Sequence, residues 1–365
     1  MYNSRNPILQ GISNWFIRNF SDPEALALFF TLFFGFLLIK FFGKFLLPVI
    51  ISAVFSYLFA APVRWLERWW FPRWLAVTVI YFFLLGLFVL TLFSLLPLMW
   101  KQLVGIIVHE LPRAITKGQA WMTELMFRYP KLFPINPLFS FGAYLHQQSV
   151  RIGQLILSRS LASIPNVIGI ILYFVLVPLL VFFFLKDGEI ISTWISRFLP
   201  ERRGLIRIVW YEMDQKIGAY VRGRAIEIVI VSFISVIAFV LLGLQYAFLL
   251  GVLLGLSVIV PYIGAVIVAI PIAIIGLVQW GFSAYFAYLV IIYAVIITLD
   301  GNILVPFLFS EIMDLHPVTI LLSTLIFGGI WGFWGVFFAI PLATLTKSVL
   351  SAWPQTSRRR ALEGG

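Results

Sequence analysis

The chain contains no cysteine and little charge. Without cysteine, disulfides, thiolate metal sites and a thiol nucleophile are excluded. Charged residues make up 11% of the 365 residues and hydrophobic ones 62%, whereas about a quarter of the residues of a soluble protein are charged. Between Glu227 and Asp300 there is no Asp, Glu, Lys or Arg. With a mean hydropathy of +1.03, this composition indicates a protein that lies in a bilayer.

Several motifs of enzymes and nucleotide-binding proteins are also missing. The chain has no GxxxxGK[ST] phosphate loop, no HExxH and no GxSxG elbow. Its three histidines, His109, His146 and His316, are too scattered to indicate a metal site. We therefore expect no enzyme, no metal and no cofactor. The net charge of +11 indicates membrane topology and contact with anionic lipid, and we expect no nucleic-acid partner.

Eight apolar segments are long enough to cross a bilayer, for which a helix needs about 20 mostly apolar residues. They lie near residues 25–41, 45–63, 74–98, 163–185, 226–243, 247–278, 282–299 and 317–346. The sixth and eighth are too long for one straight span and carry Pro or Gly in the middle, so each is a tilted helix, a broken helix or a re-entrant hairpin. The predicted fold is an all-α polytopic membrane protein with amphipathic helices outside the bilayer.

The charges between these segments predict an orientation and a division into regions. Lys and Arg gather in the stretches 64–73, 197–224 and 347–360, which places these stretches and both termini in the cytoplasm. Residues 1–22 show no removable signal peptide, and the last five residues resemble a remnant of expression engineering. We expect three spans in 1–98, external amphipathic helices in 99–160, a fourth span in 161–185, a charged cytoplasmic helical region in 186–224, a transport core in 225–350 and a cytoplasmic tail in 351–365.

Glycine and proline inside the apolar segments are candidates for a substrate path. Gly251 and Gly255 give a flat helix face, which serves either helix packing or a narrow path. Proline frees a carbonyl one turn earlier, and in lipid such a carbonyl must face protein or a polar cavity. The motif that begins at Gly264 has a weak echo at Gly335, consistent with a parallel repeat. The predicted path residues are Gly251, Gly255, Pro261, Tyr262, Gly264, Pro271, Asn302, Pro306, His316, Pro317, Gly328, Gly329, Gly332, Gly335 and Pro341.

Ionisable residues inside spans are functional candidates because burying them is costly. Only Glu227 and Asp300 qualify, and both lie near the ends of predicted spans. Asp300 could bind a proton or a cation, or could simply end its helix at the external surface. Glu227 could simply pair with Arg222 or Arg224 one turn away.

Nearly the whole chain resembles a known family, and the resemblance is most specific in the second half. The similar segments are 182–189, 220–223, 251–264 and 300–341, which include Asp300-Gly-Asn302 and Leu315-His316-Pro317. They resemble the autoinducer-2 exporter family of PerM-like permeases, except that Arg224 stands where the family usually has Gln. The resemblance implies an inner-membrane protein of about eight spans that forms homo-oligomers, with a pentamer as the expected state. The matching residues Asp187, Tyr220, Arg222 and Gly223 are expected to form a cytoplasmic gate or coupling region.

Three functional hypotheses follow. The first is export, or facilitated passage, of a small polar organic solute such as autoinducer-2, since a neutral solute needs hydroxyl and backbone groups. The second is a sodium-proton antiporter that uses Asp300. The third is a membrane scaffold that transports nothing and organises partners through residues 99–160 and 186–224.

Overall fold

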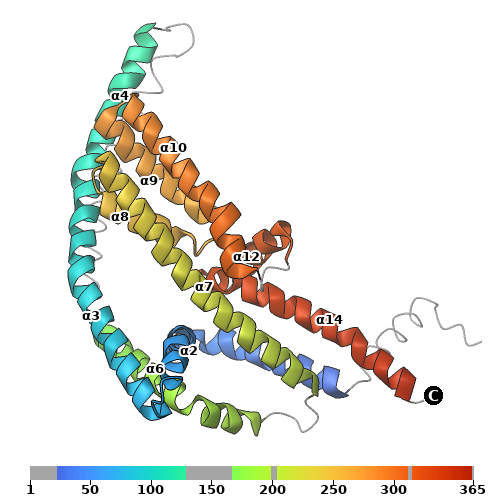
Figure 1. The fold of residues 1–365 in the computed structure, drawn as a ribbon. Coiled ribbons are helices and arrows are strands. Elements are labelled where there is room, and N and C mark those ends of the chain that lie inside the picture. Colours follow the sequence, from blue (N-terminus) through green and yellow to red (C-terminus); the bar gives the residue numbers. More distant parts are fainter. Residues whose placement is uncertain (1–22, 129–166, 199–203, 311–314, 364–365) are drawn as a thin grey trace, which may run out of the picture. The chain divides into compact units, whose positions relative to one another are not determined.

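The protein is all-helical in the part of the chain that the structure describes. The structure is a computed structural model that describes residues 23–128, 167–198, 204–310 and 315–363 (Figure 1). No β-strand occurs in these ranges. The predicted all-α class is therefore confirmed, whereas the interpretations of residues 1–22 and of most of the external region, 129–160, fall outside the described residues.

The helices run in the following order. They are α2 (Pro23–Glu67), α3 (Arg73–Gly105), a π-helical turn (Ile106–Glu110), α4 (Leu111–Arg128), α6 (Val167–Ser196), α7 (Gly204–Leu242), α8 (Ala247–Ser257), α9 (Ile263–Trp280), α10 (Ala284–Leu299), a second π-helical turn (Asp300–Leu304), α11 (Val305–Phe309), α12 (Pro317–Trp331), α13 (Phe333–Phe337) and α14 (Ala339–Glu363).

Six helical segments among the described residues are long and apolar enough to cross a membrane, and two further apolar helices are shorter. The six are Leu26–Gly43, Phe45–Glu67, Arg73–Trp121, Gly204–Leu242, Ile263–Trp280 and Ala284–Phe309, and the two shorter helices are α8 and α12. The predicted fourth crossing, 163–185, coincides with α6 over its described part but is not one of the six. The chain is thus polytopic, as predicted.

Two predicted crossings, 25–41 and 45–63, belong to one uninterrupted helix. The sequence led us to expect a loop near Lys40 and Lys44, but α2 passes through this region and extends over 45 residues. Lysine is a good helix former and its long stem can lie along apolar surface, so a pair of lysines does not by itself end a helix. A helix of this length measures about 67 Å, which exceeds a ~30 Å hydrocarbon layer.

The predicted sixth crossing, 247–278, is a broken helix. Its first half, α8, ends at Ser257, and Tyr262 adopts a positive φ of 61° immediately before α9. Pro261 cannot donate a backbone hydrogen bond, which favours the break at this position. At Gly264 a Cβ atom would lie 1.8 Å from the carbonyl oxygen of Ser257, so only glycine fits where the chain folds back.

The predicted eighth crossing, 317–346, is broken in a similar way. Gly332 has a positive φ of 60° and separates α12 from α13, and α12 packs against α13 and α14. A Cβ atom at Gly335 would lie 1.8 Å from the carbonyl oxygen of Phe327. Gly264 and Gly335, the two positions of the sequence echo, thus both face a backbone carbonyl of the preceding helix at the same short distance.

Contacts between Cα atoms divide the chain into two compact units. The first unit contains Met1–Tyr81, Leu176–Gly223 and Phe309–Gly365, and the second contains Phe82–Val175 and Arg224–Leu308. In the second unit α9 contacts both α8 and α10, and α4 contacts α9 (Figure 1).

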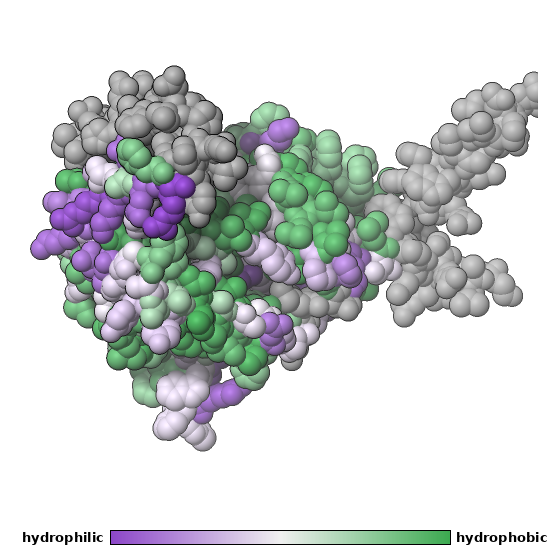
Figure 2. All heavy atoms as spheres, turned by 90° about the horizontal axis from the view of Figure 1, so that it is seen from above, coloured by the Kyte–Doolittle hydropathy of each residue, from purple (hydrophilic) through white to green (hydrophobic). Residues whose placement is uncertain are grey.

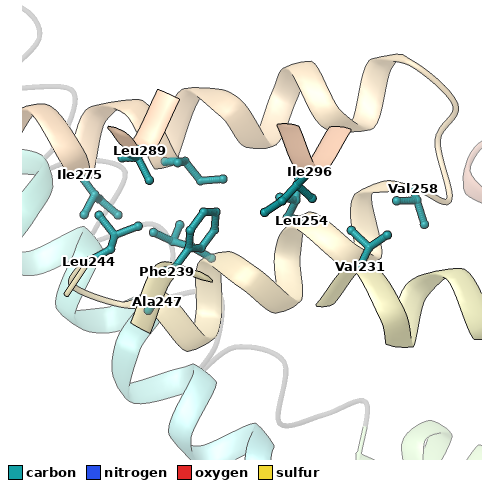
Figure 3. Close-up of a cluster of buried hydrophobic side chains, with 11 residues drawn as sticks. Val231, Phe239, Leu244, Ala247, Leu254, Val258, Ile275, Leu289 and Ile296 are labelled. Atoms are coloured by element: carbon teal, nitrogen blue, oxygen red, sulfur yellow. The ribbon is translucent and has the colours of Figure 1, made fainter. Parts of the chain in front are cut away.

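The core of the second unit lies between the C-terminal half of α7, α8, α9 and α10. Figure 3 shows Phe239 of α7, Leu254 of α8, Ile275 of α9 and Leu289 of α10 converging in this core. The crossing of α7 and α8 is close because of glycine: a Cβ atom at Gly255 would lie 1.9 Å from Ser232 Oγ. The two glycines of α8 therefore act in helix packing, the first of the two alternatives.

Apolar side chains also cover much of the outside of the molecule. Figure 2 shows hydrophobic residues over a large part of the visible surface. Phe34, Phe41 and Phe45 of α2 are 63%, 72% and 80% exposed, and Phe82 and Phe83 of α3 are similarly exposed. Such surfaces are stable in contact with lipid acyl chains and would aggregate in water.

Helix α4 is amphipathic and belongs to the second unit. The Lys117 ammonium donates a hydrogen bond to the carbonyl of Val278 near the C-terminus of α9. The rings of Trp121 and Phe282 pack with centroids 5.2 Å apart. The described part of the predicted external region, up to residue 128, is thus helical and attached to the second unit by both polar and aromatic contacts.

Replacement of Gly255 by alanine tests the close crossing of α7 and α8. The added methyl group would overlap Ser232, so we expect Gly255→Ala to lower the free energy of unfolding by about 1–3 kcal/mol. The measurement is the midpoint of thermal unfolding of the purified protein in detergent. Gly86→Ala is the control, because a Cβ atom there meets nothing within 4 Å. Equal midpoints for the two variants would contradict this packing.

Candidate functional site

A buried ion pair lies on α7, inside an otherwise apolar region. Arg224 and Glu227 are 4% and 1% exposed, and Arg224 Nη1 is 2.6 Å from Glu227 Oε2. The three-residue spacing places both side chains on the same face of the helix. The same Nη1 donates a 2.9 Å hydrogen bond to the carbonyl oxygen of Val258, directly after α8. Arg224 thus binds a carbonyl at the break between α8 and α9.

Asp300 is the third ionisable residue of this region. It begins the π-helical turn between α10 and α11, and its carboxylate oxygen Oδ1 is buried with no hydrogen-bond partner among the described residues. The charge of Asp300 interacts electrostatically with those of both Arg224 and Glu227. The structure therefore brings together the two carboxylates that the sequence singled out, and adds a guanidinium to them.

An apolar cavity of about 280 Å³ adjoins Asp300. Its lining comes from α7, α10 and the π-helical turn, and apart from Asp300 it consists of aliphatic side chains. Val231 and Ile296, which line it, also belong to the core in Figure 3. The cavity is thus a space of low polarity with a single carboxylate in its wall.

The charges of the cluster balance only when one carboxylate is neutralised. Arg224 carries one positive charge, and Glu227 and Asp300 carry one negative charge each, so the ionised cluster has a net charge of −1. Uptake of one proton or one monovalent cation makes it neutral. Since an uncompensated charge inside a membrane protein is costly, the cluster favours uptake of a positive charge. It can therefore bind and release a proton or a cation.

The helices at these residues extend beyond the predicted spans. The predicted span starts at residue 226, whereas α7 begins at Gly204 and Glu227 lies well inside this helix. Of the alternatives for Asp300, the one in which it ends its helix is wrong, because the helical segment continues through the π-helical turn to Phe309. Asn302 Nδ2 donates a 2.9 Å hydrogen bond to the carbonyl oxygen of Thr298, so Gly301-Asn302 widen the helix instead of ending it.

The other predicted path residues are divided between the two units. In the second unit Gly251, Gly255 and Gly264 are buried in helix contacts, Pro271 is inside α9, and Tyr262, Asn302 and Pro306 are exposed. The remaining ones belong to the first unit. There His316 caps α12 by accepting a 3.3 Å hydrogen bond from the Val318 amide. The following residues are Pro317, Gly328, Gly329 and Gly332 on or next to α12, Gly335 on α13 and Pro341 on α14.

The predicted gate residues lie in the first unit. Tyr220 is buried and its hydroxyl donates a 2.8 Å hydrogen bond to the carbonyl oxygen of Phe337. A Cβ atom at Gly223 would lie 2.7 Å from the ring of Phe309, which shows how closely α7 meets α11 there. Arg222 interacts electrostatically with Arg64 and Asp214, and Asp187 sits at a kink of α6. Tyr220 and Gly223 both lie against the ring of Phe309, whereas nothing joins Asp187 to them in the described part of the chain.

The sequence offered Arg224 as one of two partners for Glu227, and the structure shows this pair. We otherwise treated Arg224 as a departure from the family pattern and missed its second contact. Its contact with the Val258 carbonyl, 34 residues away, depends on the fold and has no sequence signature.

Comparison with known proteins agrees with the membrane-spanning fold. The family model described as "AI-2E family transporter" matches residues 12–355. The chain belongs to this family. It is 41% identical over 348 residues to the putative permease PerM of Escherichia coli K12, which covers 95% of this chain and 98% of PerM. It is 26% identical to the putative transport protein YueF of Bacillus subtilis, covering 85% of this chain and 84% of YueF.

A further relative carries a more specific name. The AI-2 transport protein TqsA of Escherichia coli K12 is 24% identical over 314 residues, covering 86% of this chain and 87% of TqsA. Together with the family match, these relatives identify the chain as a multi-pass membrane transport protein of the AI-2E family.

Replacement of Arg224 by methionine tests the buried ion pair. The change leaves Glu227 buried without its partner, so we expect the free energy of unfolding to fall by about 3–5 kcal/mol. Arg224→Met/Glu227→Met should recover most of this loss, since it removes both charges. Arg128→Met, in an exposed pair with Glu124, should change stability by less than about 1 kcal/mol. Thermal unfolding in detergent measures all three, and a double variant no more stable than Arg224→Met would refute the pairing.

Proposed function

We propose that this protein is a proton-coupled secondary transporter that exports a small polar organic solute of the autoinducer-2 type. The observation that carries the proposal is the buried Asp300 Oδ1, which has no hydrogen-bond partner among the described residues. Asp300 lines an apolar cavity and interacts electrostatically with the Arg224–Glu227 pair. Ionisable groups held in such surroundings inside membrane helices serve proton relays in pumps and transporters. Asp300 is therefore the proposed coupling residue.

A proton fits this site better than a metal cation does. Among the residues that line the cavity, Asp300 alone has a side-chain oxygen. A hard cation is bound by several oxygen ligands, and sodium sites in transporters also use unwound backbone carbonyls. A proton needs a single carboxylate oxygen.

Two considerations support a small polar solute as the cargo. The relative TqsA is named an AI-2 transport protein, and the stretch between Glu227 and Asp300 holds no charged residue that could bind an ionic cargo. At the break between α8 and α9 the exposed Tyr262 contributes a hydroxyl group, and broken helices are typical of solute sites in transporters. Within the second unit, the proposed path is the part of 251–271 at this break, around Pro261 and Tyr262.

The distribution of basic residues supports a location in the bacterial inner membrane with both termini in the cytoplasm. A homo-oligomer, with a pentamer as the first expectation, belongs to the same proposal.

Sodium-proton exchange at Asp300 is the second candidate. It is favoured by the π-helical turn, because such turns recur at functional sites and the widened backbone can turn a carbonyl towards an ion. The scaffold hypothesis gains no support from the relatives, which are named permeases or transport proteins.

Proteoliposomes with an internal pH indicator distinguish these candidates. A gradient of autoinducer-2 should drive a pH change with the unaltered protein, and Asp300→Asn should slow it by about tenfold or more, because the amide cannot carry the proton. Glu124→Gln, at an exposed carboxylate of α4, is the control and should behave like the unaltered protein.

A sodium gradient applied to the same vesicles should drive no pH change. If sodium drives it and Asp300→Asn abolishes it, the protein is an antiporter and export of a solute is not its coupled reaction. If Asp300→Asn exchanges as fast as the unaltered protein, Asp300 is not the coupling residue and both candidates at this site fail.

A further inference from the structure

A second and larger cavity lies in the first unit, and the transport proposal makes no use of it. Its volume is about 450 Å³, within the range of about 300–1,000 Å³ that is usual for ligand pockets. The walls come from α2, α7, α12, α13 and α14, with Ile39 and Gly43 on one side and Trp331 and Trp334 on another. No charged residue lines it, and Trp331 and Trp334 are the lining residues whose side chains carry a nitrogen atom.

One of these nitrogens is a buried donor. Trp331 Nε1 is buried and has no hydrogen-bond partner among the described residues. Aromatic neighbours hold the indole, with the ring of Phe36 at a centroid distance of 5.5 Å and that of Phe327 stacked at 6.0 Å. A buried donor without an acceptor is destabilising, so an occupant that supplies one acceptor would be stabilised here.

Water and polar solutes do not fit this cavity. A buried water usually makes two to four hydrogen bonds, and these walls offer little beyond an indole N–H. A polar solute would lose its hydration without replacement. The suitable occupant has a long apolar body and a single hydrogen-bond acceptor.

From this chemistry we infer that the cavity binds a membrane phospholipid, with an acyl chain along the apolar wall and an ester carbonyl accepting the Trp331 N–H. The helices α2 and α7 contain segments that are long and apolar enough to cross a membrane, and in a membrane phospholipid is the molecule at highest concentration beside such helices. Tryptophan is enriched at the membrane–water interface, where the ester groups of phospholipids also lie.

Gly43 offers a way to fill the cavity. It lines the wall, and a Cβ atom there meets nothing within 4 Å, so a leucine side chain enters open space without moving the backbone. The control is Gly86→Leu, at an exposed helical glycine of α3 that is equally unobstructed and does not line this cavity.

The first experiment measures phospholipid binding to the purified full chain by native mass spectrometry, with dioleoylphosphatidylglycerol as the probe. Gly86→Leu should bind it like the unaltered protein, and Gly43→Leu should bind it about tenfold or more weakly. Equal binding by the two variants overturns the inference. So does a Gly43→Leu protein that keeps its lipid but loses self-association, since the occupant would then be a second copy.

The second experiment tests the hydrogen bond with the diether analogue of the same lipid, which has no ester carbonyl. The unaltered protein should bind the diester about fivefold more tightly than the diether, the factor expected for one net hydrogen bond. Trp331→Phe should bind the two lipids equally. If the unaltered protein and Trp331→Phe show the same ratio of diester to diether affinity, Trp331 is not the donor.

Discussion

The hydrogen bond from Arg224 to the carbonyl of Val258 is the contact on which the second unit depends. Lipid supplies no hydrogen bonds, so a helix that breaks inside an apolar region must find protein partners for its freed carbonyls. Here the partner is a guanidinium, whose positive charge in turn needs Glu227 at 2.6 Å. The break between α8 and α9 therefore brings an ion pair with it, and the pair places a charge next to Asp300.

The need to pair each buried charge explains why charged residues are rare in this region and why those present lie together at one site. Between Glu227 and Asp300 the sequence has no charged residue, and the fold brings the two ends of that stretch to one site. Each member compensates part of the cost of the others, and Asp300 Oδ1 is buried without a hydrogen-bond partner among the described residues. The ionised cluster lacks one positive charge, and this deficit is the basis of the proposed uptake and release of a proton.

The sequence predicted the membrane class well, because composition and length decide it. It also offered a broken helix as one of three alternatives for the sixth and eighth crossings, because both carry proline or glycine in the middle. The predictions from the sequence failed where contacts between residues distant in the chain determine the structure. The continuity of α2 past Lys44 and of the helical segment past Asp300 could not be read from local residues, since lysine and Gly301-Asn302 permit both a helix and its end. Arg224 was undervalued because its partner carbonyl is distant in sequence.

The π-helical turn at Asp300–Leu304 also changes which residues share a face of the helix. One extra residue in a turn shifts the angular register by about 100°, so α10 and the residues after the turn do not share a single helical wheel. A face assigned from the periodicity of α10 points elsewhere once Leu304 is passed. Asp300 lies where the helical register changes. The widened turn, and neither flanking helix, therefore sets the direction of its carboxylate.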